Sequence, residues 1–449
     1  MFDIREYGAK PDGVNINTKA IQAAIDQCSQ SGGGCVLISG GTFVSGTLHI
    51  KSNVCLEIDV TARLLGSPDL NDYTTDTHWC RYGEGPSGYT LIDRCFLYAQ
   101  DAENITICGG GIIDGNESFF PDEKLPDGSQ RPRPMMLRTL RCKNVRLQGL
   151  RLYRAAGWTT NFIETNDIWC QNLDINSCIR NHSDGLDFDS CQNVFVSNCK
   201  LFTGDDGLCL QSSNTKIPTK NIQVTNCHFS SWCASIRIGL LSKGTITNVT
   251  INNCSFDDVW REGVKIECSQ GGTISDIIVS NLVMRNVCRP VFLLLHNFKP
   301  LRGNKITPEI GKMERIVFTN IIATDTEDMK NPRIKPNKPI IGGTVYNGIK
   351  VDANENYPIN QLTLKNIIYT TYGGVKKDDI PSEYPKVWDE RYDCPEKRVS
   401  NYYPTWSRAA FMDIRNVKGL YLDNLDFRAI NKDEREPYII EGCEIIKGF

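Results

Sequence analysis

Three aspartates lie in two short motifs of the sequence. The stretch HSDGLD at 182–187 contains Asp184, and TGDDGLCL at 203–210 contains Asp205 and Asp206. Carboxylates gathered in one place can divide acid and base work, because crowding lets one of them retain a proton near neutral pH. A single Asp more often stabilises a turn. Three carboxylates together predict a catalytic centre. Like charges at close range destabilise a fold, so such a cluster is expected where it has a function.

A repeated strand pattern explains how the two motifs can meet. Short alternating segments recur as NVRLQGLRL, NDIWCQNLDI, NVFVSNCKL, NIQVTNCHF, NVTINNCSF and SDIIVSNLVM, at intervals of 22 to 28 residues. Each is rich in Val and Ile and bounded by turn residues, which is typical of a short strand. No helical pattern separates them, so the chain must coil rather than form strand–helix–strand units. We predict an all-β fold, a right-handed parallel β-helix, as a single domain over 1–449.

Stacked coils place equivalent residues beside one another. Asp184 precedes Asp205 by slightly less than one repeat, so the carboxylates fall on neighbouring coils about 4.8 Å apart. Gly204 and Gly207 permit the bend that lets both Asp205 and Asp206 reach solvent. The same stacking predicts a ladder of Cys199, Cys227 and Cys254, with Asn198, Asn226 and Asn253 at the adjacent turn.

The ends and the period-breaking segments complete the predicted architecture. Residues 17–28 carry Ile21, Ala24, Ile25 and Cys28 at helical spacing after Asn17, which predicts a short cap helix with Asn17 as N-cap. Segments 66–93, 114–138 and 371–407 are rich in charge, proline and aromatic residues. They are predicted to be long loops over the binding face.

Composition limits the classes of partner. The 449 residues carry a net charge of -3 with 40% apolar residues, which describes a globular chain without the basic surface that nucleic acids require. The sequence contains no spanning segment, and the opening MFDIREYGAKPDG has no apolar leader core. A cytoplasmic protein is therefore expected, or a secreted one if the N-terminus was trimmed. The 19 cysteines form no C-x-x-C pair and are expected to be mostly reduced and buried. The oligomeric state is left open.

Nearly the whole chain resembles glycoside hydrolase family 28, the polygalacturonases and rhamnogalacturonan hydrolases. The resemblance is strongest in HSDGLDFDSCQNVFVSNCKLFTGDDGLCLQS, which corresponds to the family's N-T-D-G and G-D-D motifs. It implies hydrolysis with inversion, in which Asp205 is the general acid while Asp184 and Asp206 position and deprotonate water. Asp187 matches a family position near the bound sugar, and a turn or ladder role is an equal alternative.

The departures from the family pattern concern substrate binding. His182 and Ser183 replace Asn and Thr of the first motif, and His182 is either an acid/base or a hydrogen-bond donor to substrate. The family's His-Gly falls at Cys233 and Ala234, so the nearest imidazole is His228. The R-I-K motif that grips a uronate becomes Lys265, Ile266 and Glu267.

The reversed charge in this motif changes the expected substrate. Glu267 is expected to repel a uronate or to bind neutral hydroxyls. Arg237 either restores the lost cation, pairs with Glu267 or faces solvent.

We therefore predict an exo-acting glycosidase of a pectin-derived or related oligosaccharide, with plain homogalacturonan disfavoured. Such hydrolysis requires no cofactor, and no metal-ligand pattern stands out. Trp158, Trp232 and Trp260 are either sugar platforms or packing residues. A β-helix lyase or epimerase is the first alternative, and a non-catalytic carbohydrate-binding β-helix is the second.

Overall fold

The structure is a computed structural model. It describes residues 1–77, 94–121, 123, 125–126, 131–296, 298–299, 310–325, 346–380, 388–389 and 406–447. The chain divides into two compact units, Met1–Asp206 and Gly207–Phe449. The single domain over 1–449 stays a prediction.

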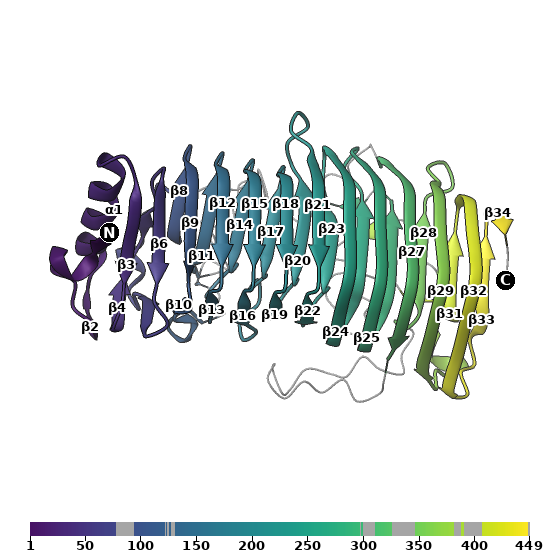
Figure 1. The fold of residues 1–449 in the computed structure, drawn as a ribbon. Helices are drawn as coiled ribbons and strands as arrows, with labels where there is room; N and C mark the ends of the chain where they lie inside the picture. Colours follow the sequence, from purple (N-terminus) through teal and green to yellow (C-terminus); the bar gives the residue numbers. More distant parts are fainter. Residues whose placement is uncertain are drawn as a thin grey trace. The chain divides into compact units, whose positions relative to one another are not determined.

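Three stacks of parallel strands build the first unit, and five of its coils contribute one strand to each stack (Figure 1). Stack A contains β5 (Leu48–His49), β8 (Cys95–Gln100), β11 (Met135–Leu140), β14 (Thr160–Ile163) and β17 (Leu186–Asp189). Stack B contains β1 (Phe2–Asp3), β3 (Gly34–Ile38), β6 (Val54–Ile58), β9 (Glu103–Gly109), β12 (Lys143–Gln148), β15 (Asn166–Gln171) and β18 (Gln192–Ser197). Stack C contains β2 (Asp12–Ile16), β4 (Gly41–Ser45), β7 (Ala62–Gly66), β10 (Ile112–Asp114), β13 (Arg151–Tyr153), β16 (Asp174–Ser177) and β19 (Lys200–Thr203).

The interior of the first unit is filled by ladders of apolar side chains. Alternate strand residues point inward, so register partners meet from coil to coil. In stack B one such ladder runs through Val36, Leu56, Ile107, Leu147, Cys170 and Val196. In stack A the rings of Phe162 and Phe188 stack with centroids 5.0 Å apart. The core is therefore a continuous column that holds the turns at fixed heights.

Asparagines in left-handed backbone conformation lie where the chain enters stack B. Asn53, Asn104 and Asn144 have φ of 62°, 56° and 52°, a region that Asn tolerates better than most residues. The amide of Asn104 donates to Oδ1 of Asn53, and that of Asn144 donates to Oδ1 of Asn104, each at 2.8 Å. These side chains form an asparagine ladder along the turns.

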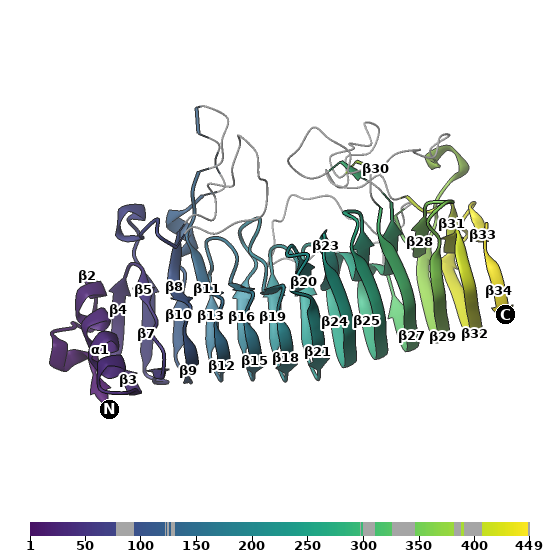
Figure 2. The same cartoon turned by 90° about the horizontal axis from the view of Figure 1, so that it is seen from above.

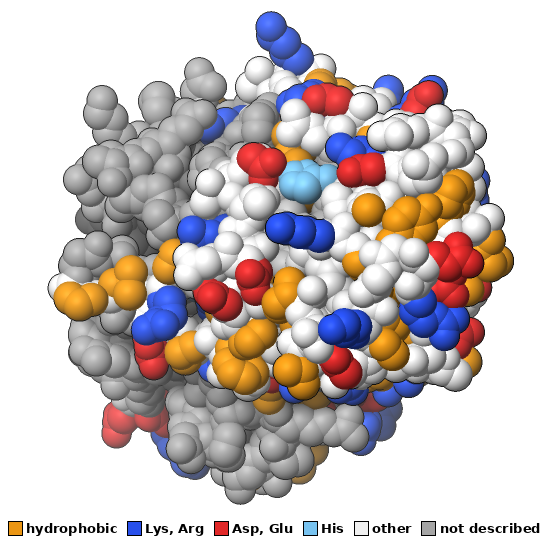
Figure 3. Space-filling view, turned by 90° about the vertical axis from the view of Figure 1, so that its left-hand side faces the viewer, with side chains coloured by type: hydrophobic (Ala, Val, Ile, Leu, Met, Phe, Trp, Pro, Cys, Tyr) orange, Lys and Arg blue, Asp and Glu red, His pale blue; other side chains and the backbone are white. Residues whose placement is uncertain are grey.

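Helix α1 (Thr18–Gln30) lies at the N-terminal end of the first unit and confirms the predicted cap helix (Figure 1). The four apolar residues of the predicted helical pattern are fully buried on its inner face: Ile21, Ala24, Ile25 and Cys28. The prediction that the Asn17 side chain caps the helix is wrong. That side chain accepts from the Lys10 backbone N–H and donates to the Asn15 carbonyl, so it fixes the segment before the helix instead. Basic, acidic and hydrophobic side chains are interspersed on the outside of this end (Figure 3).

The predicted loops are partly described. In 66–93 a short 3₁₀ turn, η2 (Leu70–Asp72), follows β7, and 78–93 lie outside the described residues. In 114–138 the turn η4 (Glu117–Phe119) follows β10, but the loop is shorter than predicted because β11 begins at Met135. In 371–407 strand β29 runs on to Gly373 and η5 (Lys377–Asp379) follows. Most of 381–405 lies outside the described residues.

The second unit has the same parallel pairing with longer strands, several of which bend through more than one stack (Figure 2). Its strands are β20 (Leu208–Ser212), β21 (Thr219–Thr225), β22 (His228–Ser231), β23 (Ile236–Ser242), β24 (Thr245–Cys268), β25 (Thr273–Leu295), β26 (Phe298–Lys299), β27 (Lys312–Thr324), β28 (Ile349–Ala353), β29 (Ile359–Gly373), β30 (Trp388–Asp389), β31 (Ala409–Arg415), β32 (Val417–Asn431), β33 (Glu436–Glu441) and β34 (Glu444–Lys447). A small separate sheet pairs β26 with β30.

The cysteines behave as predicted over the described residues. All 17 that are described are free, and 13 of them are buried. Cys227 and Cys254 stack within the second unit, because the next residues, His228 and Ser255, lie opposite each other. Cys199 belongs to the first unit. Among the described residues no helix is long and apolar enough to cross a membrane.

Candidate active site

The three predicted aspartates meet in the first unit. Asp184 lies in the turn between β16 and β17, and Asp205 and Asp206 follow β19. Carboxylate oxygens of Asp184 and Asp206 lie within 4.8 Å of each other, as do those of Asp205 and Asp206. Asp184 and Asp206 are 6% and 1% exposed, whereas Asp205 is half-buried. The predicted clustering is confirmed, but Asp206 does not reach solvent as expected.

Backbone hydrogen bonds orient Asp205. The N–H of His182 donates to its Oδ2 at 3.2 Å, and the N–H of Asp206 donates to its Oδ1 at 3.0 Å. The Asp206 carbonyl accepts from the N–H of Gly185 at 2.9 Å. Main-chain hydrogen bonds therefore connect the two motifs, and they fix the positions of the carboxylates.

Gly204 allows this close approach. A Cβ at Gly204 would lie 2.3 Å from the Arg180 carbonyl oxygen and 2.5 Å from Oγ of Ser183. Ser183 cannot yield easily, since its Oγ donates to the carbonyls of Ser177 and Arg180 at 2.6 and 2.5 Å. The glycine is thus required by space, rather than by the bend that the sequence suggested.

Arg133 is a residue that sequence reasoning missed. Its guanidinium, 2% exposed, places Nη2 3.3 Å from Nδ1 of His182. Because arginine only donates, Nδ1 of His182 is the acceptor and Nε2 carries the ring proton when the imidazole is neutral. The signal was present in RPRPMMLR, where an arginine precedes a strand of the site-bearing stack.

Glu117 is a second residue that sequence reasoning missed. It lies on η4, and its carboxyl is 3.7 Å from Nε of Arg154. Burial raises the pKa of Glu117, and Arg154 offsets part of that rise. The Arg180 guanidinium donates two hydrogen bonds to the Glu117 carbonyl at 3.1 and 2.9 Å. This contact connects η4 to the turn that carries Asp184.

Asp187 occupies a ladder on the outer side of stack A. It lies opposite Asn161, which lies opposite Arg138, and Arg138 lies opposite Tyr98. Asp187 is 1% exposed. Of the two predicted roles, the ladder position is confirmed, and contact with a sugar stays a prediction.

In the second unit, Arg237, Lys265 and Glu267 form a buried ion cluster. Nε of Arg237 is 2.5 Å from Oε1 of Glu267, and Nζ of Lys265 is 3.4 Å from its Oε2. The three side chains are 9%, 1% and 0% exposed. Arg237 therefore pairs with Glu267 and does not face solvent. Glu267 has no exposed surface, and direct binding of substrate hydroxyls by its carboxylate stays a prediction.

The remaining predicted residues lie in other positions. His228 is on β22, where its Nδ1 is 2.9 Å from Oγ of Ser255. Arg237 and Lys265 lie elsewhere, opposite each other in the pairing of β23 with β24. A binding role for His228 stays a prediction. Trp158, Trp232 and Trp260 are 6%, 8% and 7% exposed, which favours packing over sugar stacking.

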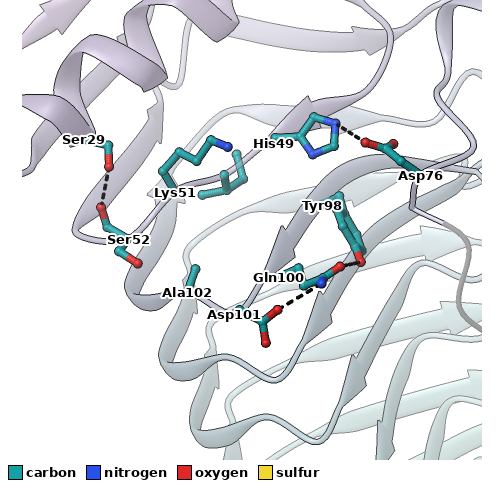
Figure 4. A pocket seen from close by; sticks show the side chains of 10 residues that line it. Ser29, His49, Lys51, Ser52, Asp76, Tyr98, Gln100, Asp101 and Ala102 are labelled. Carbon is teal, nitrogen blue, oxygen red and sulfur yellow. Dashed lines mark hydrogen bonds and ion pairs between the residues drawn. The ribbon is translucent and has the colours of Figure 1, made fainter.

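A pocket of about 450 Å³ lies elsewhere in the first unit, over the N-terminal part of stack A (Figure 4). His49, Lys51, Asp76, Tyr98 and Gln100 are among its lining residues. Nε2 of His49 lies 3.6 Å from Oδ2 of Asp76, and Tyr98 donates to Gln100 at 2.6 Å. Strands β11 and β14 separate β8 from β17, a distance of about 14 Å at ordinary strand spacing. The pocket is therefore distinct from the aspartate cluster.

Comparison with known proteins identifies the relatives of this chain. It is 22% identical over 357 residues to a probable polygalacturonase of Vitis vinifera, covering 76% of this chain and 72% of that protein. It is 25% identical over 355 residues to the exo-poly-alpha-D-galacturonosidase of Dickeya chrysanthemi, covering 68% of this chain and 58% of that protein. The family 28 exopolygalacturonase structure of Yersinia enterocolitica matches with a TM-score of 0.68 at 20% identity, covering 100% of this chain and 78% of that one.

The structural match confirms the right-handed parallel β-helix. The model of "Glycosyl hydrolases family 28" matches residues 28–373, a span that includes the aspartate cluster and the Arg237–Glu267 pair. The chain is a glycoside hydrolase and belongs to glycosyl hydrolases family 28.

Proposed function

We propose that this chain is an inverting, exo-acting hydrolase of uronate-containing oligosaccharides derived from pectin. Asp205 protonates the glycosidic oxygen, while Asp184 and Asp206 hold water and take its proton. The observation that carries this proposal is the clustering of three carboxylates. An oxygen of Asp184 and an oxygen of Asp205 each lie within 4.8 Å of an oxygen of Asp206. Carboxylates at such range can divide acid and base work between them.

Exposure supports the division of roles. Asp205 is the most accessible of the three and is oriented by two backbone N–H groups, so it can reach the oxygen of a leaving sugar. Asp184 and Asp206 are buried and form the inner pair. Water held between two carboxylates is deprotonated as it attacks, and the proton passes to the pair.

The charge balance around Glu267 removes the argument against a uronate. Its negative charge is offset by Arg237 and Lys265, so the cluster has a net charge of about +1 when all three are ionised. Repulsion of a uronate by Glu267, which the sequence predicted, is therefore no longer expected. The names of the Dickeya and Yersinia relatives, an exo-poly-galacturonosidase and an exopolygalacturonase, support the same substrate class and the exo mode.

Carboxylate spacing favours a second stereochemical course. Glycosidases with carboxyl groups about 5 Å apart ordinarily retain configuration, whereas inversion uses about 6.5–9.5 Å. Inversion here is supported by the family resemblance, and retention by the short separation. The NMR signal of the first product anomer decides between them: an inverted anomer supports the proposal, and a retained anomer overturns this part of it.

The direct test is incubation of the purified chain with oligogalacturonates of defined length. We expect release of short product from one chain end from the first minutes, with no unsaturated product absorbing in the ultraviolet. A mixture of all product lengths would contradict the exo mode. Failure to cleave any uronate oligosaccharide, with cleavage of a neutral one, would contradict the substrate class.

A further inference from the structure

The pocket over the N-terminal part of stack A lies where two coils meet helix α1 (Figure 4). Ser29 of α1 is among its lining residues, and His49 of β5 lies opposite Tyr98 of β8 in the strand register. Its volume of about 450 Å³ falls within the range of about 300–1,000 Å³ that is usual for small-molecule sites. None of its lining residues takes part in the proposed hydrolysis, so the pocket needs an explanation of its own.

Helix α1 and strand β8 hold His49 in place. The Gln22 side chain accepts a hydrogen bond from the His49 backbone N–H at 2.8 Å and donates one to the His49 carbonyl at 3.0 Å. The imidazole and the Tyr98 ring form a T-shaped pair with centroids 5.9 Å apart. The fold therefore sets the position of His49, as is typical of preformed binding sites.

A chain of hydrogen bonds orients the polar groups on the β8 side of the pocket. The Tyr98 hydroxyl donates to Oε1 of Gln100 at 2.6 Å, and Nε2 of Gln100 donates to Oδ2 of Asp101 at 2.9 Å. The Arg141 guanidinium donates to both oxygens of Asp101 at 2.7 and 2.8 Å, which lowers the pKa of Asp101 to about 2. Gln100 keeps one amide N–H, and the Tyr98 oxygen keeps a lone pair, for the hydroxyls of a ligand.

Lys51 supplies a cation to this pocket. Its side chain extends toward His49, which lies between Lys51 and Asp76 (Figure 4). Its ammonium group forms no hydrogen bond or ion pair within the described residues. Because Arg141 offsets the charge of Asp101, Lys51 and Asp76 are the charges that remain to meet a ligand.

The remaining charges exclude several classes of ligand. A phosphorylated compound carries about two negative charges and would meet one cation with an anion nearby. A divalent metal ion of the calcium type usually requires several carboxylates, whereas only Asp76 is left for it. Stacking of an aromatic ligand requires an exposed ring face, and Tyr98 is 4% exposed. What remains is a polyhydroxylated ligand with one carboxylate.

We propose that this pocket binds one hexose-sized sugar acid, with its carboxylate at Lys51 and its hydroxyls at Asp76, His49 and Gln100. Hydroxyls both donate and accept, so they suit a wall that offers a carboxylate, an imidazole and an amide. The pocket is a binding site apart from the aspartate cluster. That galacturonate, the sugar acid of pectin, is the natural occupant rests on the proposed function.

The experiment is a titration of the full chain with galacturonate, followed by the NMR signals of its five imidazoles. His49→Gln identifies the His49 signal by its loss. We expect this signal to shift saturably in the wild type, and Lys51→Met should weaken the binding by about tenfold or more, because it removes a charged partner. The matched control is Lys200→Met, which removes an exposed lysine of stack C in the same unit and should leave the titration unchanged.

Two further probes test the chemical class. Galactose has the hydroxyls without the carboxylate, and acetate has the carboxylate without the hydroxyls, so each should bind at least about tenfold more weakly than galacturonate. Galactose or acetate binding as tightly as galacturonate would overturn the assignment of a sugar acid. An unmoved His49 signal in the wild type, or equal affinity in wild type and Lys51→Met, would overturn the site.

The same variant separates this proposal from the proposed function. Lys51→Met should retain kcat on short oligogalacturonates within about twofold, because Lys51 lies about 14 Å or more from the aspartate cluster at ordinary strand spacing. Loss of turnover in Lys51→Met would contradict a site apart from the catalytic centre. A wild-type chain that binds galacturonate at His49 but cleaves no oligogalacturonate would contradict the proposed function and support the site.

Discussion

Nε of Arg237 donates a hydrogen bond to Oε1 of Glu267 at 2.5 Å between two buried side chains. Glu267→Gln leaves Arg237 and Lys265 as buried cations without their anion. Breaking such a pair costs about 3–5 kcal/mol of unfolding free energy. Denaturant unfolding should show this loss, whereas Glu436→Gln at an exposed position of β33 should not. Equal stability of both variants would mean that the ion cluster is not formed in solution.

Asp205→Asn should abolish most turnover. The amide cannot deliver a proton to the leaving sugar, so kcat should fall by about a hundredfold or more. Thermal stability should fall by about 1–3 kcal/mol at most, because the Asn oxygen can still accept one of the two backbone hydrogen bonds, which end on different oxygens of Asp205. Asp26→Asn in α1 is the matched control and should retain full activity. Unchanged kcat in Asp205→Asn would remove it from the proton-donor role.

Substitutions of His182 test whether its backbone N–H or its imidazole is required for turnover. Its φ is 56°, which Asn tolerates and a β-branched residue does not. His182→Asn should keep the N–H bond to Asp205 and retain kcat within about tenfold, since this removes only a side-chain contact. His182→Val should cost about 1–3 kcal/mol of stability. If both variants lose kcat equally without loss of stability, the imidazole itself takes part in the reaction.

Gly204→Ala should disrupt the site through a backbone collision. The new Cβ would lie 2.3 Å from the Arg180 carbonyl, and relief of such overlap typically costs about 1–3 kcal/mol. The shift moves Asp205 as well, so kcat should fall together with stability. Gly157→Ala is the control, since its nearest neighbour would lie 3.5 Å away. Full activity of Gly204→Ala would show that the turn has room that the structure does not.

Asp325 should make stability fall as pH rises through the mildly acidic range. Burial raises its pKa to about 6, above the value of about 3.9 in an unfolded chain. The folded state then holds a proton that the unfolded state has lost, so its contribution is present below pH 4 and disappears by about pH 6. The change is about 3 kcal/mol. The difference in unfolding free energy between wild type and Asp325→Asn should follow this curve, and a flat difference would contradict it.

The repeat predicted the fold because the strand period determines both which side chains face inward and how long each coil is. Apolar alternation in segments such as NVRLQGLRL specifies which side chains face inward, and the coil length then places Asp184 near Asp205 and Asp206. RPRPMMLR shows an arginine before a strand of this stack, but the sequence could not pair Arg133 with His182, because that contact joins a segment outside the repeat to a turn. The sequence also left three positions open for Arg237, and the structure selects pairing with Glu267, which offsets the negative charge of that motif. The Asn17 side chain does not cap the helix, because it bonds instead to the N–H and the carbonyl of Lys10.

The asparagine ladder has a direction. Asn104 donates to Asn53 and Asn144 to Asn104. A separate ladder in the second unit runs the same way, since Asn320, Asn366 and Asn424 each donate to the asparagine one coil earlier. A carboxylate can accept in such a chain but cannot donate, so an aspartate is tolerated only where a ladder starts. Asp167 holds that place: it receives the amide of Asn193, while Oδ1 of Asn144 finds no donor among the described residues. Deamidation at Asn104 would therefore cut the chain of amides on its N-terminal side and leave the C-terminal side intact.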